Sequence, residues 1–310
     1  MTLYLDEAAV RALLQWDELI DAVEVALTAF SSGRVLQPVR NMLTIEEGKR
    51  YLGVMPAVAE HAMGLKLVSF YPGNAGTGVP THLAMILLFR PDTGEPLAVM
   101  DGRLITEMRT AAVSAAVVKH LAPRDVRVLA LIGSGVQAEA HLEAFAHVRR
   151  FDEVRVWSRT AEHARAFAAK HKVAAMELEQ AVRGADVVVT ATSSLEPIVR
   201  GAWLKPGALV TAVGSPRPTW RELDDETMAN ILVVDSREAV LKESGDVILS
   251  KASIHAEVGE IFAGTKSVPP GKTIVFKSVG IATEDIATAK LVYDRAIGAE
   301  RGDGPPATTG

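Results

Sequence analysis

The spacing of hydrophobic residues changes along the chain, and each spacing predicts a different kind of element. Between residues 16 and 30, apolar side chains recur at the helical period, which predicts an amphipathic helix. From residue 36 to 100 the apolar runs are short, β-prone and separated by turn sequences, which predicts a mixed or antiparallel sheet with hairpins. The Ala-rich segment 105–121 predicts a helix that ends before Pro123. The predicted strands are 51–54, 65–70, 83–89 and 97–100.

After residue 123, strands and helices alternate. The strands are continuously apolar, which is typical of a parallel sheet covered by helices on both faces. A last helix over 284–297 is expected to pack back on the N-terminal part of the chain, because chain ends tend to lie close together. The predicted strands are 126–132, 154–157, 186–191, 208–213 and 231–234, and the predicted helices between them are 136–147, 161–171 and 178–183.

The predicted fold class is therefore α/β, a Rossmann-type doubly wound parallel sheet plus a smaller α+β domain. The expected domains are 1–122 for substrate, 123–282 for a dinucleotide, and 283–310 as a returning helix with a flexible tail from residue 300.

The composition excludes several classes of function. A net charge of -5 without a basic stripe argues against nucleic acid, and the absence of cysteine excludes disulfides, thiolate nucleophiles and iron–sulfur clusters. The longest apolar segment, 81–89, is far shorter than the roughly 20 residues that span a bilayer, and no signal peptide is recognisable, so a cytoplasmic protein without membrane contact is expected. No metal is predicted, because no set of His, Asp or Glu residues has metal-ligand spacing. Six histidines are interpreted as mostly solvated positions on helices or loops: His61, His120, His141, His147, His163 and His171.

The motif G-x-G-x-x-A at residues 133–138 lies between a predicted strand and a predicted helix. Its first glycine allows a tight turn, its second lets the backbone approach a pyrophosphate, and the helix start binds the anion. The alternative is an ordinary structural turn. The predicted cofactor-binding residues here are Gly133, Ser134, Gly135, Val136 and Gln137.

The end of the second strand distinguishes the two nicotinamide cofactors. It carries Ser158, Arg159 and Thr160 and no acid, which favours NADPH over NADH because an arginine there binds the 2′-phosphate. Arg159 as a solvated surface charge is the alternative. Thr192 and Val213 lie at the tips of later strands and are predicted cofactor contacts, with ordinary turn residues as the alternative for Thr192 and for Gly214, which follows Val213.

Three cations of the N-terminal part lie in apolar surroundings: Arg40, Lys66 and Arg109. Each alone is more often a snorkelling or internally paired side chain, whereas three together indicate an anion site that suits a carboxylate. Lys66 can also donate a proton. His82 is either a donor near the nicotinamide or a core histidine.

Several longer motifs resemble those of a known protein family. They are QPVR at 37–40, RYLGVMPA at 50–57, KLVSFYPGN from Lys66, LAVMDGRLITEMRTAAVSA from Leu97, VGSPRPTWRELDDE from Val213, VDSREAVLKESGDV from Val234 and FKSVGIATED from Phe276. Together they cover nearly the whole chain. The chain resembles the ornithine cyclodeaminase and mu-crystallin family, and within it the ketimine reductase branch.

The resemblance implies NADPH-dependent reduction of a cyclic ketimine, Δ1-piperideine-2-carboxylate or Δ1-pyrroline-2-carboxylate, by a homodimer joined through the N-terminal domain. It implies that the three cations hold the substrate carboxylate, with Lys66 and Arg109 as the catalytic pair. It places Thr81 and His82 at the nicotinamide end, Lys277 and Ser278 beside the cofactor, and Ser215 at the substrate.

Two departures from the family pattern bear on the reaction. The acids that serve the diamine in ornithine cyclodeaminases align with Gly53 and Pro216, which argues against cyclodeamination. Ser215 is shifted by one place from the serine of the ketimine reductase branch. The open alternatives are an alanine or N-alkyl amino acid dehydrogenase, and a protein that binds NADPH and a hormone-like carboxylate without turnover.

Overall fold

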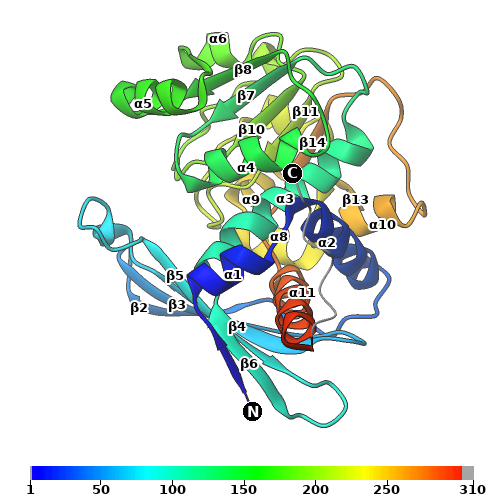
Figure 1. Ribbon diagram of the computed structural model, residues 1–310. Helices are drawn as coiled ribbons and strands as arrows, with labels where there is room; N and C mark the ends of the chain where they lie inside the picture. Colours follow the sequence, from blue (N-terminus) through cyan, green and yellow to red (C-terminus); the bar gives the residue numbers. More distant parts are fainter. Residues whose placement is uncertain (1, 302–310) are drawn as a thin grey trace, which may run out of the picture. The chain divides into compact units, whose positions relative to one another are not determined.

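The computed structural model describes residues 2–301, which form two compact units (Figure 1). Within that range, the first unit comprises the segment up to Ala26, Gly33–Arg109 and the segment from Ala282 onward. The second comprises Leu27–Ser32 and Thr110–Ile281. The division falls inside a helix, at 109/110, and not after that helix at 122/123, because the helix residues that follow Thr110 are buried in the second unit. Residues 302–310 of the predicted flexible tail lie outside the described residues.

The first unit is built on a six-stranded sheet. Its strand order is β1-β6-β5-β4-β3-β2, with β1 parallel to β6 and all other pairs antiparallel, as a mixed sheet with hairpins requires. Burial alternates along β3, so one face of the sheet is covered and the other is partly open. The strands are β1 Leu3–Leu5, β2 Asn41–Glu46, β3 Arg50–Val58, β4 Met63–Phe70, β5 His82–Phe89 and β6 Pro96–Asp101.

Helix α11 packs against β3, β4 and β5 and covers what we call the inner face of this sheet. The approach is close at Gly64, where an added Cβ would lie 2.4 Å from the Leu87 carbonyl oxygen and 2.9 Å from Ile286 Cδ1. The sequence did not indicate α1, a short helix whose N-cap Asp6 accepts a hydrogen bond from the Ala9 amide at 2.9 Å. The helices here are α1 Glu7–Leu13, most of α2 Trp16–Ser31, the 3₁₀ turn η1 Pro72–Asn74, the start of α3 Arg103–Leu121, and α11 Ala282–Arg301.

The second unit contains an eight-stranded sheet in which every pair is parallel, so the Rossmann-type prediction is confirmed. Its order is β13-β12-β14-β11-β10-β7-β8-β9. All four residues of each of the central strands β10, β11 and β14 are buried. The strands are β7 Val128–Ile132, β8 Glu153–Trp157, β9 Ala174–Ala175, β10 Val187–Thr190, β11 Leu209–Ala212, β12 Ile231–Val234, β13 Ile254–Glu257 and β14 Ile274–Lys277.

Short helices connect these strands. They are α4 Val136–Ala146, α5 Ala161–His171, α6 Leu178–Val182, the 3₁₀ turn η2 Gly201–Trp203, α7 Asp225–Met228, α8 Arg237–Glu243, α9 Gly245–Ser250 and α10 Val258–Phe262. No helix within residues 2–301 combines the length and apolar character needed to cross a membrane.

Candidate functional site

The dinucleotide motif lies at the topological switch point of the parallel sheet, where the order in which the chain adds strands reverses. Strand β7 has β8 on one side and β10 on the other, and the chain runs outward through β8 and β9 before it returns to β10. Ligands of such sheets bind outside the carboxyl ends of the strands at this reversal. The turn that begins at Gly133 and the loop that begins at Ala191 are the segments that follow β7 and β10.

The backbone of the turn after β7 requires glycine. Gly133 has φ 122°, and an added Cβ would lie 2.7 Å from the Ala191 carbonyl oxygen. Gly135 caps α4 without any side chain, and Val136 is 57% exposed, so the N–H groups of the first helical turn open toward solvent. Ala138 is buried, as the packing of helix on sheet demands. Together with Ser134 and Gln137 at the helix start, this arrangement fits a bound pyrophosphate.

The end of β8 is open to solvent. Arg159 and Thr160 are exposed and Ser158 is half-buried, with Thr160 as the N-cap of α5. A guanidinium and two hydroxyl groups therefore flank this strand end, where an acid would be expected for NADH.

The loop after β10 is held by a buried acid that the sequence did not reveal as part of the site. Glu222 Oε1 accepts hydrogen bonds from the amide and the hydroxyl of Thr192, each 2.7 Å long, and Glu222 Oε2 accepts from the Thr190 hydroxyl at 2.7 Å. Burial raises the pKa of Glu222 despite the charge of Lys277. Gly214 completes the contact, since a Cβ there would lie 2.4 Å from Glu222 Oε1.

Four of the predicted contacts near the cofactor or substrate bond to protein groups instead. The Lys277 ammonium is fully buried, 2.9 Å from Asp246 Oδ2, and donates to the Gly214 carbonyl at 2.6 Å. The other three behave alike. The Ser278 hydroxyl donates to Asp235 at 2.8 Å, the buried Ser215 hydroxyl to the Ser194 carbonyl at 2.7 Å, and the Val213 amide to the Thr190 carbonyl at 2.9 Å. Their roles toward ligands stay predictions.

In the first unit, two of the three predicted cations meet in one buried ion network. Lys66 Nζ lies 2.6 Å from Asp285 Oδ2, and Arg109 binds both Glu284 Oε2 at 2.6 Å and Asp285 Oδ1 at 2.9 Å. Lys66 is 2% exposed, Arg109 is 4% exposed and both acids are 0% exposed. The two cations thus project from β4 and α3 onto the first turn of α11.

Arg40 completes the set electrostatically. It directly precedes Asn41 of β2, whose partner on β3 is Val54, the neighbour of Met55, and Met55 pairs directly with Lys66 of β4. Its charge is one of the influences that lower the pKa of Lys66. Lys66 and Arg109 are thus held by two carboxylates, and the charge of Arg40 adds to theirs at Lys66, which suits the binding of an anion.

The network sets the protonation of its members. Burial lowers the pKa of Lys66 to about 8, with Arg109 and Arg40 contributing in the same direction and Asp285 opposing them. Although burial works to raise it, Arg109 and Lys66 hold the pKa of Asp285 below its usual range. At neutral pH the lysine is therefore charged, yet closer to releasing its proton than an exposed lysine is.

Two histidine assignments change. His82 is exposed at the start of β5, with its ring centre 4.4 Å from that of Phe70, so its interpretation as a core histidine is wrong. The preceding Thr81 accepts a hydrogen bond from the Tyr71 amide through its carbonyl group. His141 is not solvated as predicted. It is 0% exposed, bonded to the Gln137 carbonyl and the Ser114 hydroxyl, and burial lowers its pKa to about 4.

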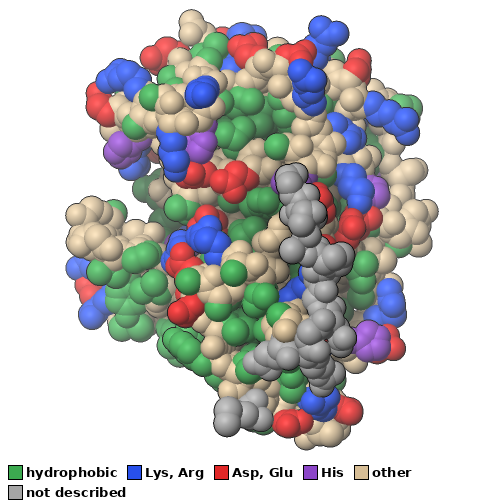
Figure 2. All heavy atoms as spheres, viewed as in Figure 1, with side chains coloured by type: hydrophobic (Ala, Val, Ile, Leu, Met, Phe, Trp, Pro, Cys, Tyr) green, Lys and Arg blue, Asp and Glu red, His purple; other side chains and the backbone are tan. Residues whose placement is uncertain are grey.

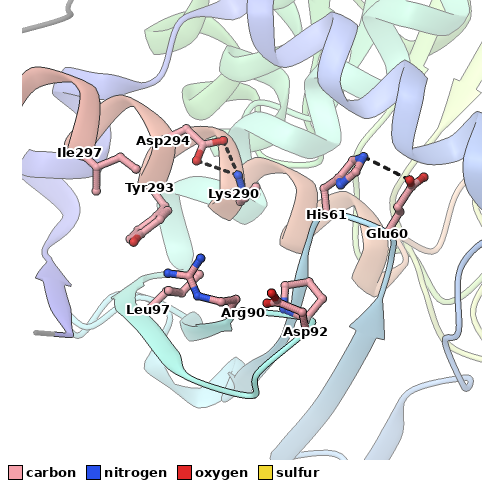
Figure 3. A pocket seen from close by; sticks show the side chains of 10 residues that line it. Glu60, His61, Arg90, Asp92, Leu97, Lys290, Tyr293, Asp294 and Ile297 are labelled. Atoms are coloured by element: carbon pink, nitrogen blue, oxygen red, sulfur yellow. Dashed lines mark hydrogen bonds and ion pairs between the residues drawn. The ribbon is translucent and has the colours of Figure 1, made fainter.

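A pocket of about 640 Å³ opens elsewhere in the first unit, between the β5–β6 hairpin and the later turns of α11 (Figure 3). Both of its Lys and Arg side chains have acidic partners: Lys290 binds Asp294, and Arg90 binds Glu95 at 3.0 Å. None of the sequence-predicted site residues lines this pocket.

Comparison with known proteins agrees with this architecture. The family model described as "Ornithine cyclodeaminase/mu-crystallin family" matches residues 2–300. Ketimine reductase mu-crystallin of Mus musculus is 52% identical over 285 residues, which are 89% of this chain and 91% of that protein. The structure of Thermococcus litoralis Δ1-pyrroline-2-carboxylate reductase with NADH and L-proline has a TM-score of 0.91 and 36% identity, covering 97% of this chain and 98% of that one.

A third similar protein comes from the alanine dehydrogenases. An archaeal alanine dehydrogenase dimer with bound NAD has a TM-score of 0.90 and 34% identity, covering 96% of this chain and 97% of that one. Fold and comparisons together define the class, a protein that joins a Rossmann-type dinucleotide unit to a smaller sheet unit. The chain belongs to the ornithine cyclodeaminase/mu-crystallin family.

Proposed function

We propose that the chain reduces the C=N bond of a cyclic ketimine carboxylate, Δ1-piperideine-2-carboxylate or Δ1-pyrroline-2-carboxylate, with NADPH as the hydride donor. The observation that carries the proposal is the buried network of Lys66 and Arg109 on Glu284 and Asp285, with the positive charge of Arg40 acting on Lys66. Relatives named as ketimine and Δ1-pyrroline-2-carboxylate reductases support the same reaction class.

Each part of the chain has a defined task in this reaction. The turn from Gly133 to Gln137 would hold the pyrophosphate, and the bound dinucleotide supplies the hydride. Arg40 and Arg109 neutralise the charge of the substrate carboxylate and orient it. Lys66 holds the proton destined for the imine nitrogen. Its pKa near 8 keeps it charged at neutral pH and lowers the cost of giving that proton up.

The reaction is tested by following the absorbance of reduced nicotinamide with a panel of substrates. The panel comprises the two cyclic imines, pyruvate with methylamine, pyruvate with ammonia, and ornithine. We expect rapid oxidation only with the cyclic imines. A higher kcat/KM for pyruvate with an amine would favour an alanine or N-alkyl amino acid dehydrogenase, and binding without any turnover would favour a carrier protein.

We further propose NADPH as the preferred cofactor, on the basis of Arg159 at the open end of β8. Arg159→Ala is expected to raise KM for NADPH about tenfold or more, since charge-assisted hydrogen bonds to phosphate are strong, and to leave KM for NADH nearly unchanged. Steady-state kinetics with both cofactors measures this. Arg165→Ala, an exposed arginine of α5 paired with Glu162, is the matched control. Equal effects of Arg159→Ala on both cofactors would contradict the assignment.

A homodimer through the first unit is also proposed. The face of the sheet opposite α11 carries large, partly exposed apolar side chains, among them Leu43, Leu83 and Met85 at 49%, 41% and 45% exposure. Figure 2 shows hydrophobic side chains gathered on the part of the surface formed by β2 and β3. An apolar sheet face of this kind suits a second copy of the chain, and the related alanine dehydrogenase is a dimer.

Sedimentation velocity tests the dimer. We expect the wild-type chain to sediment as a dimer and Leu43→Glu to shift it to the monomer, because the charge would be buried unpaired in the interface. Leu241→Glu places the same charge at an exposed leucine of the second unit and should leave the dimer intact. A monomeric wild type would refute the proposal.

A further inference from the structure

The inner face of the first unit's sheet is organised in cross-strand rows. Met55, Lys66 and Ile86 are direct partners on β3, β4 and β5, and they form the cation row. A second set of direct partners lies two residues away from the cation row on each strand, and we call it the apolar row. Its members are Met42, Gly53, Val68 and Ala84.

The apolar row shares its face with Lys66. Cross-strand partners project to the same side of a sheet, and so do residues two apart on one strand. The two rows are therefore about 6.6 Å apart, the rise of two strand residues. Val68 and Ala84 are half-buried, whereas Lys66 is 2% exposed, so the inner face becomes more accessible from the cation row to the apolar row.

The middle of the apolar row is closed by its neighbours. A Cβ on Gly53 would lie 2.7 Å from Met42 Sδ and 2.9 Å from Val68 Cγ1, so these two side chains meet over the glycine. No member of the row carries a charge or a hydrogen-bonding side chain. Further along the strands, in a third row, Tyr51 stacks on Phe70 with ring centres 6.1 Å apart, and the tilted ring of His82 lies 4.4 Å from that of Phe70.

We propose that the apolar row is the surface on which the substrate ring lies, and that Val68 sets the preference for ring size. The inference rests on the proposed function, because a carboxylate held at Arg109, with the imine nitrogen beside Lys66, places the attached ring over the next row. The substrate class that fits is a 2-imino carboxylate with an uncharged ring. A second ammonium group, as in ornithine or lysine, would lose its hydration over this row and find no partner in it.

The experiment compares kcat/KM for the six-membered and the five-membered imine in the wild type and in Val68→Ala. Removing two methyl groups enlarges the space above Gly53, so we expect the ratio of six-membered to five-membered substrate to rise about fivefold, within the range that one methylene contributes in an apolar pocket. Leu88→Val is the matched control. It trims a buried residue of the same face that lies beyond Lys66, and it should leave the ratio unchanged.

A second measurement needs no mutation. In competition with the imine, L-pipecolate is expected to inhibit the wild type at least tenfold more strongly than L-ornithine, because each ornithine molecule would bring an unpaired ammonium group onto the row. Equal inhibition by the two, or an unchanged ring-size ratio in Val68→Ala together with normal thermal unfolding, would overturn the role of the row. A wild type that reduces neither imine would instead refute the proposed function itself.

Discussion

Lys66→Ala is expected to lower kcat with Δ1-piperideine-2-carboxylate by about 10²- to 10⁴-fold, the contribution of a positioned proton donor. The Kd for NADPH should be nearly unchanged, because Lys66 belongs to the sheet of the first unit and the dinucleotide motif belongs to the second. Steady-state turnover assays give kcat, and fluorescence titration of NADPH gives the Kd. Unchanged turnover in Lys66→Ala would remove the lysine from the mechanism.

The pH dependence separates proton donation from simple charge neutralisation. In the wild type, kcat should fall as the pH rises through about 8, because burial lowers the pKa of Lys66 to that value and only the protonated form can donate. We call this fall the alkaline limb of the pH profile. In Lys66→Ala the residual activity should show no alkaline limb. Lys290→Ala removes a lysine of α11 whose partner is Asp294, and it should preserve both kcat and the limb.

The Rossmann-type half of the molecule could be predicted from the sequence because its signals are local. The turn after β7 and the apolar strands β7, β10 and β11 can each be recognised from a few consecutive residues. Strand β14 was missed although it lies between β11 and β12. Its apolar run ends in Lys277, a cation whose burial depends on the distant partner Asp246, which the sequence does not reveal.

In the candidate site, too, local sequence signals reveal only some of the residues. A lysine inside an apolar strand predicts a buried cation, but nothing near Lys66 or Arg109 in the chain reveals what pairs with them. The partners lie on α11, and Arg109 and Asp285 are 176 positions apart. Glu222 is likewise distant from the loop that it holds. Sequence spacing therefore found the cations and not the acids that determine their protonation.

Asp285→Asn is expected to destabilise the protein and to impair turnover through Lys66. The substitution keeps the shape of the side chain but removes the charge that bridges Lys66 and Arg109. Loss of one partner from a buried ion network costs about 3–5 kcal/mol in the free energy of unfolding. Urea denaturation measures this cost. Asp294→Asn breaks the partly exposed pair with Lys290 on the same helix, and it should cost about 1 kcal/mol or less.

The kinetic signature of Asp285→Asn distinguishes positioning from a purely structural role. The groups facing Lys66 are Asp285 from α11, Thr106 and Arg109 from α3, and Arg40 ahead of β2, and among them only Asp285 raises the pKa of the lysine. Without it the alkaline limb should move below pH 8, so that kcat at neutral pH falls while the Kd for NADPH stays constant. Asp285→Glu, which restores the charge, should return the limb toward its wild-type position. A folded Asp285→Asn variant with an unshifted limb would show that Asp285 stabilises the unit without tuning Lys66.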